Sequence, residues 1–516
     1  MFVNHLISVL MGPTYALPID IFRILVGLLS FIFFLRTYLE TRDFSNPNGL
    51  IDHVLSQDLY PATRFSFFQP GLSLVFFQII FMLAGLVSWL LILGYWVKLA
   101  AAFLFVVAVS TYRWNFLVMH VDDAIMHLLL FWMLLLPIGH TLVLQEYLDN
   151  GASVEIWRTL TVPGTTMRLF LMNLSLLYLA AGLWKWTSPM WRAGTALYAV
   201  FKIAISRAPK FWRPSHLPLV KVANYVALVL EPLFPLMFLL PTNSWVKWTL
   251  FIGFLGFHFG IIATMKIPLA NLAMVGATVI IFRNELMHFI LKEAPPQLEL
   301  HFPGQPGFSD LVALILVICL TLMVIWKAGS ASGLFRPLSR INQIITGTHQ
   351  NPMYGPLWAI GIAQSFRLFD WIDARNYHIS FDILETTDDM RTHNIDTQEL
   401  FPVSTRYVLL QSYLFGNIWR TIDPARLSDL RRTIFTRYAR RYCKNHKDTG
   451  LIQVYATVQR VTSDNLSLSR GVRRLIMRFA CRDCKPVLDY ICLTPELFDR
   501  KTQKSYEELQ VRSLTQ

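Results

Sequence analysis

Long apolar runs occupy the first two thirds of the chain and stop near Trp326. A helix needs about 20 consecutive apolar residues to cross a bilayer, so each run of that length predicts one membrane span. Proline, glycine and charged residues divide the runs into about nine spans. The predicted spans are approximately 19–38, 72–93, 97–112, 113–139, 167–186, 219–240, 245–265, a stretch ending at 282, and 311–326.

The last third of the chain is polar and carries a different pattern. Residues 377–384 and 450–461 alternate polar with β-branched or aromatic side chains, which predicts two strands. Asp423-Pro424 provides an N-cap and a first-turn proline for a helix that continues to about Tyr442. The apolar face of that helix consists of Leu427, Leu430, Ile434 and Tyr438.

These patterns predict a mostly α protein in two parts. Residues 1–330 form a polytopic helical membrane domain of about nine spans with additional interfacial helices. Residues 331–516 form a small C-terminal α+β extramembrane domain that is basic. We therefore expect a multi-pass integral membrane protein, and we place it in a bacterial inner membrane.

Composition agrees with this assignment, because 54% of the 516 residues are hydrophobic and only 15% are charged. The formal net charge is +13, and the tail from Ala331 onward holds 26 Lys and Arg against 18 Asp and Glu. A basic tail beside a membrane favours anionic lipid headgroups over nucleic acid, and no nucleic-acid or nucleotide-binding motif is present. The expected partners are membrane lipids and a polypeptide substrate or partner protein.

Five cysteines are too few for a disulfide framework. Cys481-Arg-Asp-Cys484 has the spacing of a metal or redox motif, but no second such pair accompanies it. Ordinary thiols or a disulfide are more frequent than zinc at an isolated pair of this kind.

Lys185 is the most informative ionisable residue in the predicted spans. It ends an apolar run and lies between Trp184, Trp186 and Trp191. Hydrocarbon cannot solvate an ammonium, so the side chain must reach the headgroups, pair with an anion, or lose its proton. Interfacial tryptophans favour the first fate, that of a membrane anchor.

Other polar residues share this membrane depth. Asp20 and Arg23 are three residues apart and can neutralise each other on one helix face. His120, Asp123 and His127 also lie on nearly one face, where they could relay protons or bind a metal, although an ion-pair cluster is commoner.

Two further spans contain breaks beside polar groups. Glu231 precedes Pro232, which frees backbone carbonyls inside the membrane. His258 lies in the next span, and Asn271 follows a second break.

Between Asp20 and Phe282 the chain resembles the HTTM (horizontally transferred transmembrane) and vitamin K-dependent γ-carboxylase-like membrane proteins. The resemblance rests on the order and spacing of four segments. They are FRILVGLL, WNFLVMHVDDAIMHLLLFWMLLLPIG, YLAAGLWKWTSPMWRAGTAL and FHFGIIATMKIPLANLAMV.

The resemblance implies a catalytic role for Lys185. In the carboxylases the lysine of the segment similar to AGLWKW deprotonates vitamin K hydroquinone, which requires an amine kept neutral by burial. Reaction with oxygen then yields a base that removes a glutamyl γ-proton, and carbon dioxide traps the carbanion. The chain departs from the family at Trp184, where the carboxylases have a second lysine, and after Ala331, where no counterpart of their large extramembrane region is recognisable.

The remaining site residues follow from the same resemblance. His258 and His120 are expected to hydrogen-bond a quinone or substrate oxygen. A quinol, either vitamin K or menaquinol, would contact Trp184, Trp186, Glu231 and Asn271, and this route requires no metal.

Two functional hypotheses remain open from the sequence. One is a quinol-dependent enzyme, and the other is a non-catalytic assembly or maturation factor, or lipid-binding scaffold, whose tail docks a partner. Loop charges place the tail in the cytoplasm, whereas the resemblance places it outside.

Overall fold

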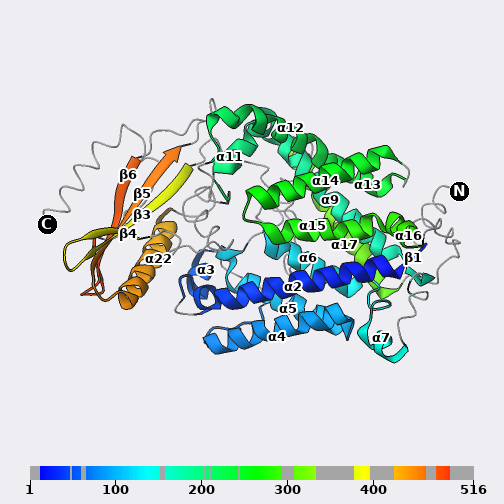
Figure 1. Ribbon diagram of the computed structural model, residues 1–516, viewed down its shortest axis with the longest axis horizontal. Helices are drawn as coiled ribbons and strands as arrows, with labels where there is room; N and C mark the ends of the chain where they lie inside the picture. The colour runs from blue at the N-terminus through cyan, green and yellow to red at the C-terminus, as the bar shows by residue number, and fades with distance from the viewer. Residues whose placement is uncertain are drawn as a thin grey trace, which may run out of the picture.

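The computed structural model describes residues 12–46, 49–59, 66–119, 121–150, 157, 159–202, 205–208, 211–241, 244–291, 307–332, 377–395, 424–460 and 472–488. The helices before residue 333 form a bundle, and a five-stranded sheet with one long helix lies at one end of it (Figure 1). The prediction of a mainly helical fold with a small strand-containing region is confirmed, and its long apolar helices are compatible with a multi-pass membrane protein.

Within the described ranges, six helices are long and apolar enough to cross a membrane. They are α2 (Ala16–Phe44), α4 (Leu74–Leu93), α5 (Val97–Trp114), α9 (Thr165–Thr187), the helical stretch Pro214–Leu239 that contains α12 (Leu217–Leu233), and α14 (Trp245–Thr264). A seventh span results if α15 (Pro268–Ile281) and α16 (Arg283–Leu291), which meet at a bend of 61°, count as one.

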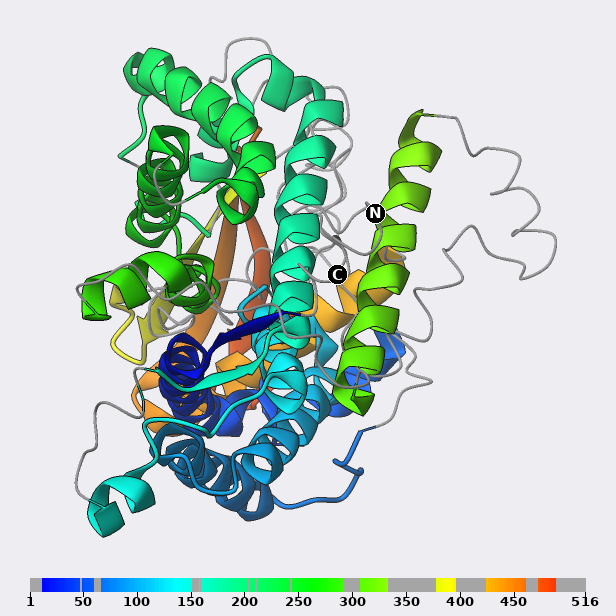
Figure 2. The same ribbon diagram turned by 90° about the vertical axis from the view of Figure 1, so that its right-hand side faces the viewer.

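The predicted number of nine spans is therefore not confirmed. The run in the fourth predicted span yields only α6 (Val121–Leu135), whose 15 residues extend about 22 Å, less than the hydrocarbon thickness of about 30 Å. Most of α6 is buried inside the bundle. In α17 (Phe308–Ser332) the apolar part is Phe308–Leu322, and this helix packs beside α9 (Figure 2).

Short elements connect the long helices. The helical ones are α3 (His53–Leu59), α7 (Leu144–Asn150), α10 (Pro189–Arg192), α11 (Ala196–Lys202) and α13 (Leu236–Leu239), with the 3-10 turns η1 (Phe116–Val118) and η2 (Pro214–His216). Strands β1 (Pro13–Tyr15) and β2 (Thr161–Pro163) pair antiparallel and join the start of α2 to the start of α9.

Asp20 and Arg23 tie the start of α2 to two neighbouring segments. Arg23 Nε donates to Asp20 Oδ1 at 2.9 Å, and both side chains are fully buried. Asp20 also accepts from the backbone N–H groups of Gly139 and Thr141, and Arg23 Nη1 donates to the carbonyl of Leu91. The predicted mutual neutralisation is confirmed, and backbone groups satisfy the remaining polar atoms that burial would otherwise penalise.

The tail contains an antiparallel sheet in the order β4-β3-β5-β6-β7. The strands are β3 (Tyr377–Thr387), β4 (Thr392–Ile395), β5 (Thr449–Arg460), β6 (Val472–Ala480) and β7 (Lys485–Leu488). Strands β3 and β5 confirm the two predicted strands, and α22 (Pro424–Asn445) confirms the predicted helix. Leu430, Ile434 and Tyr438 of α22 are buried as expected, whereas the side chain of Leu427 lies outside the described residues.

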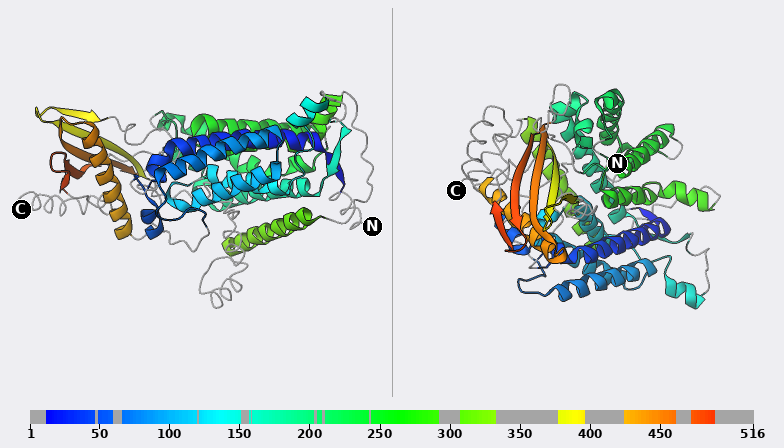
Figure 3. Two further views of the ribbon diagram at one scale, coloured as in Figure 1. Left: turned by 90° about the horizontal axis from the view of Figure 1, so that it is seen from below. Right: turned by 60° about the vertical axis from the view of Figure 1, so that its left-hand side comes forward.

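Helix α22 also docks the tail onto the membrane bundle (Figure 3). Arg437 Nη2 lies 2.8 Å from Asp52 Oδ2, and Arg441 Nη1 lies 2.5 Å from Asp43 Oδ1. Phe44 at the end of α2 and Leu50 and Ile51 after it belong to the same buried cluster as the core of the tail. The two parts therefore share a packed, charge-complementary contact.

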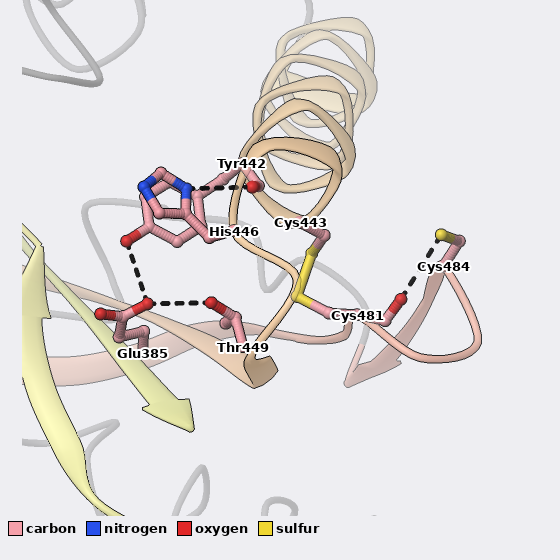
Figure 4. Close-up of a disulfide and its surroundings, with 7 residues drawn as sticks. All are labelled: Glu385, Tyr442, Cys443, His446, Thr449, Cys481 and Cys484. Carbon is pink, nitrogen blue, oxygen red and sulfur yellow. Dashed lines mark hydrogen bonds between the residues drawn. A yellow bond between two sulfur atoms is a disulfide. The ribbon is translucent and has the colours of Figure 1, made fainter. Parts of the chain in front are cut away.

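A disulfide joins α22 to the sheet (Figure 4). It links Cys443 with Cys481, while Cys484 is an exposed free thiol whose Sγ donates to the Cys481 carbonyl at 3.5 Å. Beside it, the Tyr442 hydroxyl donates to a carboxylate oxygen of Glu385 at 3.0 Å. Cys481 is therefore committed to a disulfide with Cys443, a pairing that the sequence did not predict, and Cys484 remains a thiol.

Candidate functional site

Lys185, near the end of α9, forms an ion pair with Glu231 of α12. The Nζ and Oε2 atoms are 2.5 Å apart, and each side chain is only 4% exposed. The ring centroid of Trp191 lies 5.5 Å from Nζ, close enough for its face to attract the cation. The sequence leaves three possibilities open for Lys185. The structure shows that its ammonium pairs with Glu231 inside the bundle and does not reach toward the lipid headgroups.

Gly182 allows α9 and α12 to approach closely enough for this pair. A Cβ atom at Gly182 would lie 2.6 Å from Pro232 Cδ, well inside van der Waals contact. Gly182 precedes Lys185 by three residues on one helix face, and Pro232 directly follows Glu231. The helix contact that requires a glycine is thus the one that brings the two charges together.

Pro232 has a second consequence for α12. A proline has no N–H, so the carbonyl four residues earlier, that of Leu228, loses its helical partner. Trp186 Nε1 donates to that oxygen at 3.1 Å. The carbonyl that the Glu231-Pro232 pattern frees is therefore satisfied by an indole of α9, which fastens the two helices beside the ion pair.

A hydrogen-bonded chain of three buried side chains lies deeper in the bundle. The Tyr178 hydroxyl is 2.8 Å from His258 Nε2, and His258 Nδ1 is 2.8 Å from Asn271 Oδ1. Because Asn271 Nδ2 donates to the Ile267 carbonyl, its Oδ1 accepts from His258 Nδ1–H, and Nε2 accepts from Tyr178. This arrangement is that of a neutral imidazole with every donor matched to an acceptor.

Asp122 of α6 fixes the helix end from which Asn271 projects. Its Oδ1 accepts from the backbone N–H of Ala270 at 2.8 Å. The first N–H groups of a helix have no intrahelical partners, so a carboxylate there caps α15 and complements its dipole. Pro268 at the first position also suits a helix start. Asp122 and Pro268 therefore fix the start of α15, which follows the break after α14 and carries Asn271.

The ion pair and the hydrogen-bonded chain line the same cavity, which has a volume of about 530 Å³. Helices α6, α9, α11, α12, α14 and α15 line it, and apart from these two groups the lining is nearly all apolar. Such a cavity, with a few convergent polar groups, is typical of a site for a small molecule.

The cavity opens sideways between α12 and α14. Its exposed lining residues all belong to these two helices: Leu219, Ala223, Val226, Gly256 and Gly260. Both helices are apolar enough to span a membrane, so their exposed faces would meet lipid. A lipid-soluble molecule could therefore enter from the bilayer.

Glycines on α14 create part of this space. Gly253, Gly256 and Gly260 line the cavity at spacings of three and four, and a Cβ at Gly256 or Gly260 would meet no atom within 4 Å. A glycine costs a helix interior about 1 kcal/mol relative to alanine, so these residues provide volume at the expense of helix stability. These glycines were not predicted as site residues, although their spacing in GFLGFHFG is visible in the sequence.

The structure collects some of the predicted site residues and separates others. Lys185, Glu231, His258 and Asn271 line the cavity, whereas Trp184 and Trp186 do not. The tryptophans that line the cavity are Trp191 and Trp212. Tyr178, which the sequence analysis missed, lies two turns before Lys185 on the same face of α9.

The histidine cluster of the fourth predicted span is only partly described. His120 lies outside the described residues. His127 is buried with Nε2 3.1 Å from the Ala108 carbonyl. Within the described ranges no three His, Cys, Asp or Glu side chains lie close enough together to hold a metal ion.

Comparisons with models of known protein families, with curated proteins and with solved structures found no match.

Replacing one partner of the ion pair should destabilise the protein. Lys185→Met leaves a buried carboxylate without its cation, and we expect the free energy of unfolding to fall by about 3–5 kcal/mol. Lys185→Met/Glu231→Met substitutes apolar side chains for both charges and should unfold near the wild-type temperature or above it. Thermal unfolding in detergent would measure both.

The buried pair Lys247–Glu285 supplies a matched control, because it joins α14 to α16 outside the cavity wall. Its single and double methionine variants should follow the same order. A Lys185→Met/Glu231→Met protein that unfolds as readily as the single variant would contradict the assignment of a mutually dependent pair.

Proposed function

We propose that this protein is a membrane-embedded enzyme in which the Lys185–Glu231 pair accepts a proton from a lipid-soluble quinol. The observation that carries the proposal is the position of this buried pair in the wall of a cavity that opens toward the bilayer. The resemblance of residues 20–282 to the γ-carboxylase-like proteins supports the same chemistry and adds a polypeptide as the molecule finally modified.

The pair can act as one base. In an apolar wall the pair has two forms, an ammonium with a carboxylate and an amine with a carboxylic acid. The two forms differ only in the position of one proton along the 2.5 Å contact between Nζ and Oε2. If the amine is free, Nζ takes the incoming proton; if the carboxylate is free, Oε2 takes it. Both routes end with an ammonium beside the newly formed anion and a neutral Glu231, so Lys185 supplies the compensating charge in either case.

The described residues suit a quinol. A quinol has an apolar ring and tail with hydroxyl groups at the ring, and the cavity has an apolar lining with polar groups in two places. The ion pair would hold one hydroxyl, and the Tyr178 oxygen, which already donates to His258, retains capacity to accept from another. Bound there, the quinol would supply an acidic O–H group whose deprotonation makes the ring reactive toward oxygen.

Quinol epoxidation tests the proposal. The purified protein in nanodiscs would receive reduced vitamin K or menaquinol, oxygen and a glutamate-containing peptide. We expect wild type to form the epoxide and Lys185→Met/Glu231→Met to lose about 100-fold or more of the rate, the usual contribution of a positioned base.

The control is Lys247→Met/Glu285→Met, which removes a buried pair outside the cavity and should keep the wild-type rate within about twofold. Equal rates in the two double variants would exclude the Lys185–Glu231 pair as the base. Absence of epoxide from folded wild type with both quinols would instead favour the non-catalytic assembly factor.

We also propose that the tail faces the oxidising side of a bacterial inner membrane. Disulfides persist in the periplasm and are rare in the cytosol, so Cys443–Cys481 favours the periplasmic side over the cytoplasmic location that loop charges predict.

Cys484, an exposed thiol, reports the side of the tail. Cys492 is the other tail cysteine outside the disulfide, so it is replaced in both test proteins. A membrane-impermeant maleimide applied to intact spheroplasts should label Cys492→Ser and leave Cys484→Ser/Cys492→Ser unlabelled. Labelling that occurs only after lysis would place the tail in the cytoplasm.

A further inference from the structure

We infer that an anionic phospholipid binds at the opening of the cavity, with its headgroup at Arg207 and Lys266 and an acyl chain along the gap between α12 and α14. This inference goes beyond the proposed quinol chemistry, since it depends on the opening and its surrounding charge and not on the base.

The stretch of the chain that surrounds the opening, between Glu155 and Glu285, has a strongly positive net charge. Glu231 is the only Asp or Glu between Glu155 and Glu285, a stretch that carries twelve Lys and Arg residues. That single carboxylate is already paired with Lys185 inside the cavity. The basic residues around the opening therefore have no acidic side chain from their own stretch to neutralise them.

Two of these basic residues are held at the end of the opening by backbone contacts. Ser206 and Met265 form an isolated β-bridge, the Arg207 N–H donates to the Thr264 carbonyl, and the Lys266 N–H donates to the Ile205 carbonyl. Thr264 and Met265 also line the cavity. The two bridged segments at this end of the cavity thus carry one cation each.

The positions of the two side chains suit a phosphodiester. Arg207 is exposed and uses Nε to donate to the carbonyls of Ile262 and Met265, so its two terminal amino groups remain available among the described residues. Burial, followed by the charge of nearby Arg207, lowers the pKa of Lys266. An anion between them would relieve that repulsion, and a planar guanidinium binds phosphate oxygens well.

The apolar part of the ligand has a place beside these charges. Leu219, Ala223 and Val226 form an exposed apolar strip on α12 along the opening, and Gly256 and Gly260 leave the facing surface of α14 without side chains. A strip bounded at one end by two cations matches a molecule with an anionic head and an apolar chain. A phospholipid of the surrounding bilayer has this composition.

Native mass spectrometry and thermal unfolding of the full-length protein in detergent test the inference. Phosphatidylglycerol and phosphatidylcholine with identical acyl chains would be added at equal concentrations. We expect phosphatidylglycerol to be retained at least about fivefold more and to raise the unfolding temperature more, because only its headgroup carries a net negative charge. In Arg207→Gln/Lys266→Gln the preference should disappear.

The matched control is Arg440→Gln/Lys444→Gln, which removes the same charge from exposed positions on α22 and should keep the preference. A preference that is absent in wild type, or that survives in Arg207→Gln/Lys266→Gln, would overturn the inference. Inorganic phosphate giving the same stabilisation as phosphatidylglycerol would also overturn it, because the acyl chain would then contribute nothing. Failure of quinol epoxidation leaves these outcomes unchanged.

Discussion

The membrane domain is organised around one buried ion pair. Hydrocarbon cannot solvate Lys185 or Glu231 singly, so the two helices that carry them must stay in contact. Gly182 permits that contact and Pro232 supplies its other surface, while the carbonyl that Pro232 frees is taken by Trp186. The pair, the helix packing and the backbone hydrogen bonding therefore meet at one contact between α9 and α12, and removing a single member of the pair leaves a buried charge there without its partner.

The space beside the pair has its own requirements. Glycines on α14 keep the cavity open at the expense of helix propensity, and Asp122 caps α15 so that Asn271 meets His258. A protein that needed only a stable bundle would fill this volume with side chains. Retaining an apolar, laterally open space beside a buried ion pair is understandable if a membrane-soluble molecule binds there.

Structural features that depend on local sequence pattern could be predicted, whereas features that depend on contacts between residues distant in the sequence could not. Apolar runs located the long helices, and alternation located β3 and β5, but run length alone counted α6 as a span although the bundle encloses it. Lys185 and Glu231 were each identified as intramembrane charges. Their pairing depends on a glycine–proline contact across two helices, which no local pattern reveals. Tyr178 was missed because a tyrosine in an apolar run is usually a packing residue.

Whether the cavity is a ligand site can be measured by the retention of a quinone on the purified protein. Gly256→Trp would place an indole in the open space of the wall, whereas Ala263→Trp adds the same side chain to an exposed position of α14 outside the cavity. After incubation with menaquinone and removal of excess, wild type and Ala263→Trp should each retain about one quinone per chain, as expected of a single cavity, and Gly256→Trp should retain little. Equal retention by all three proteins, or by none, would contradict the account.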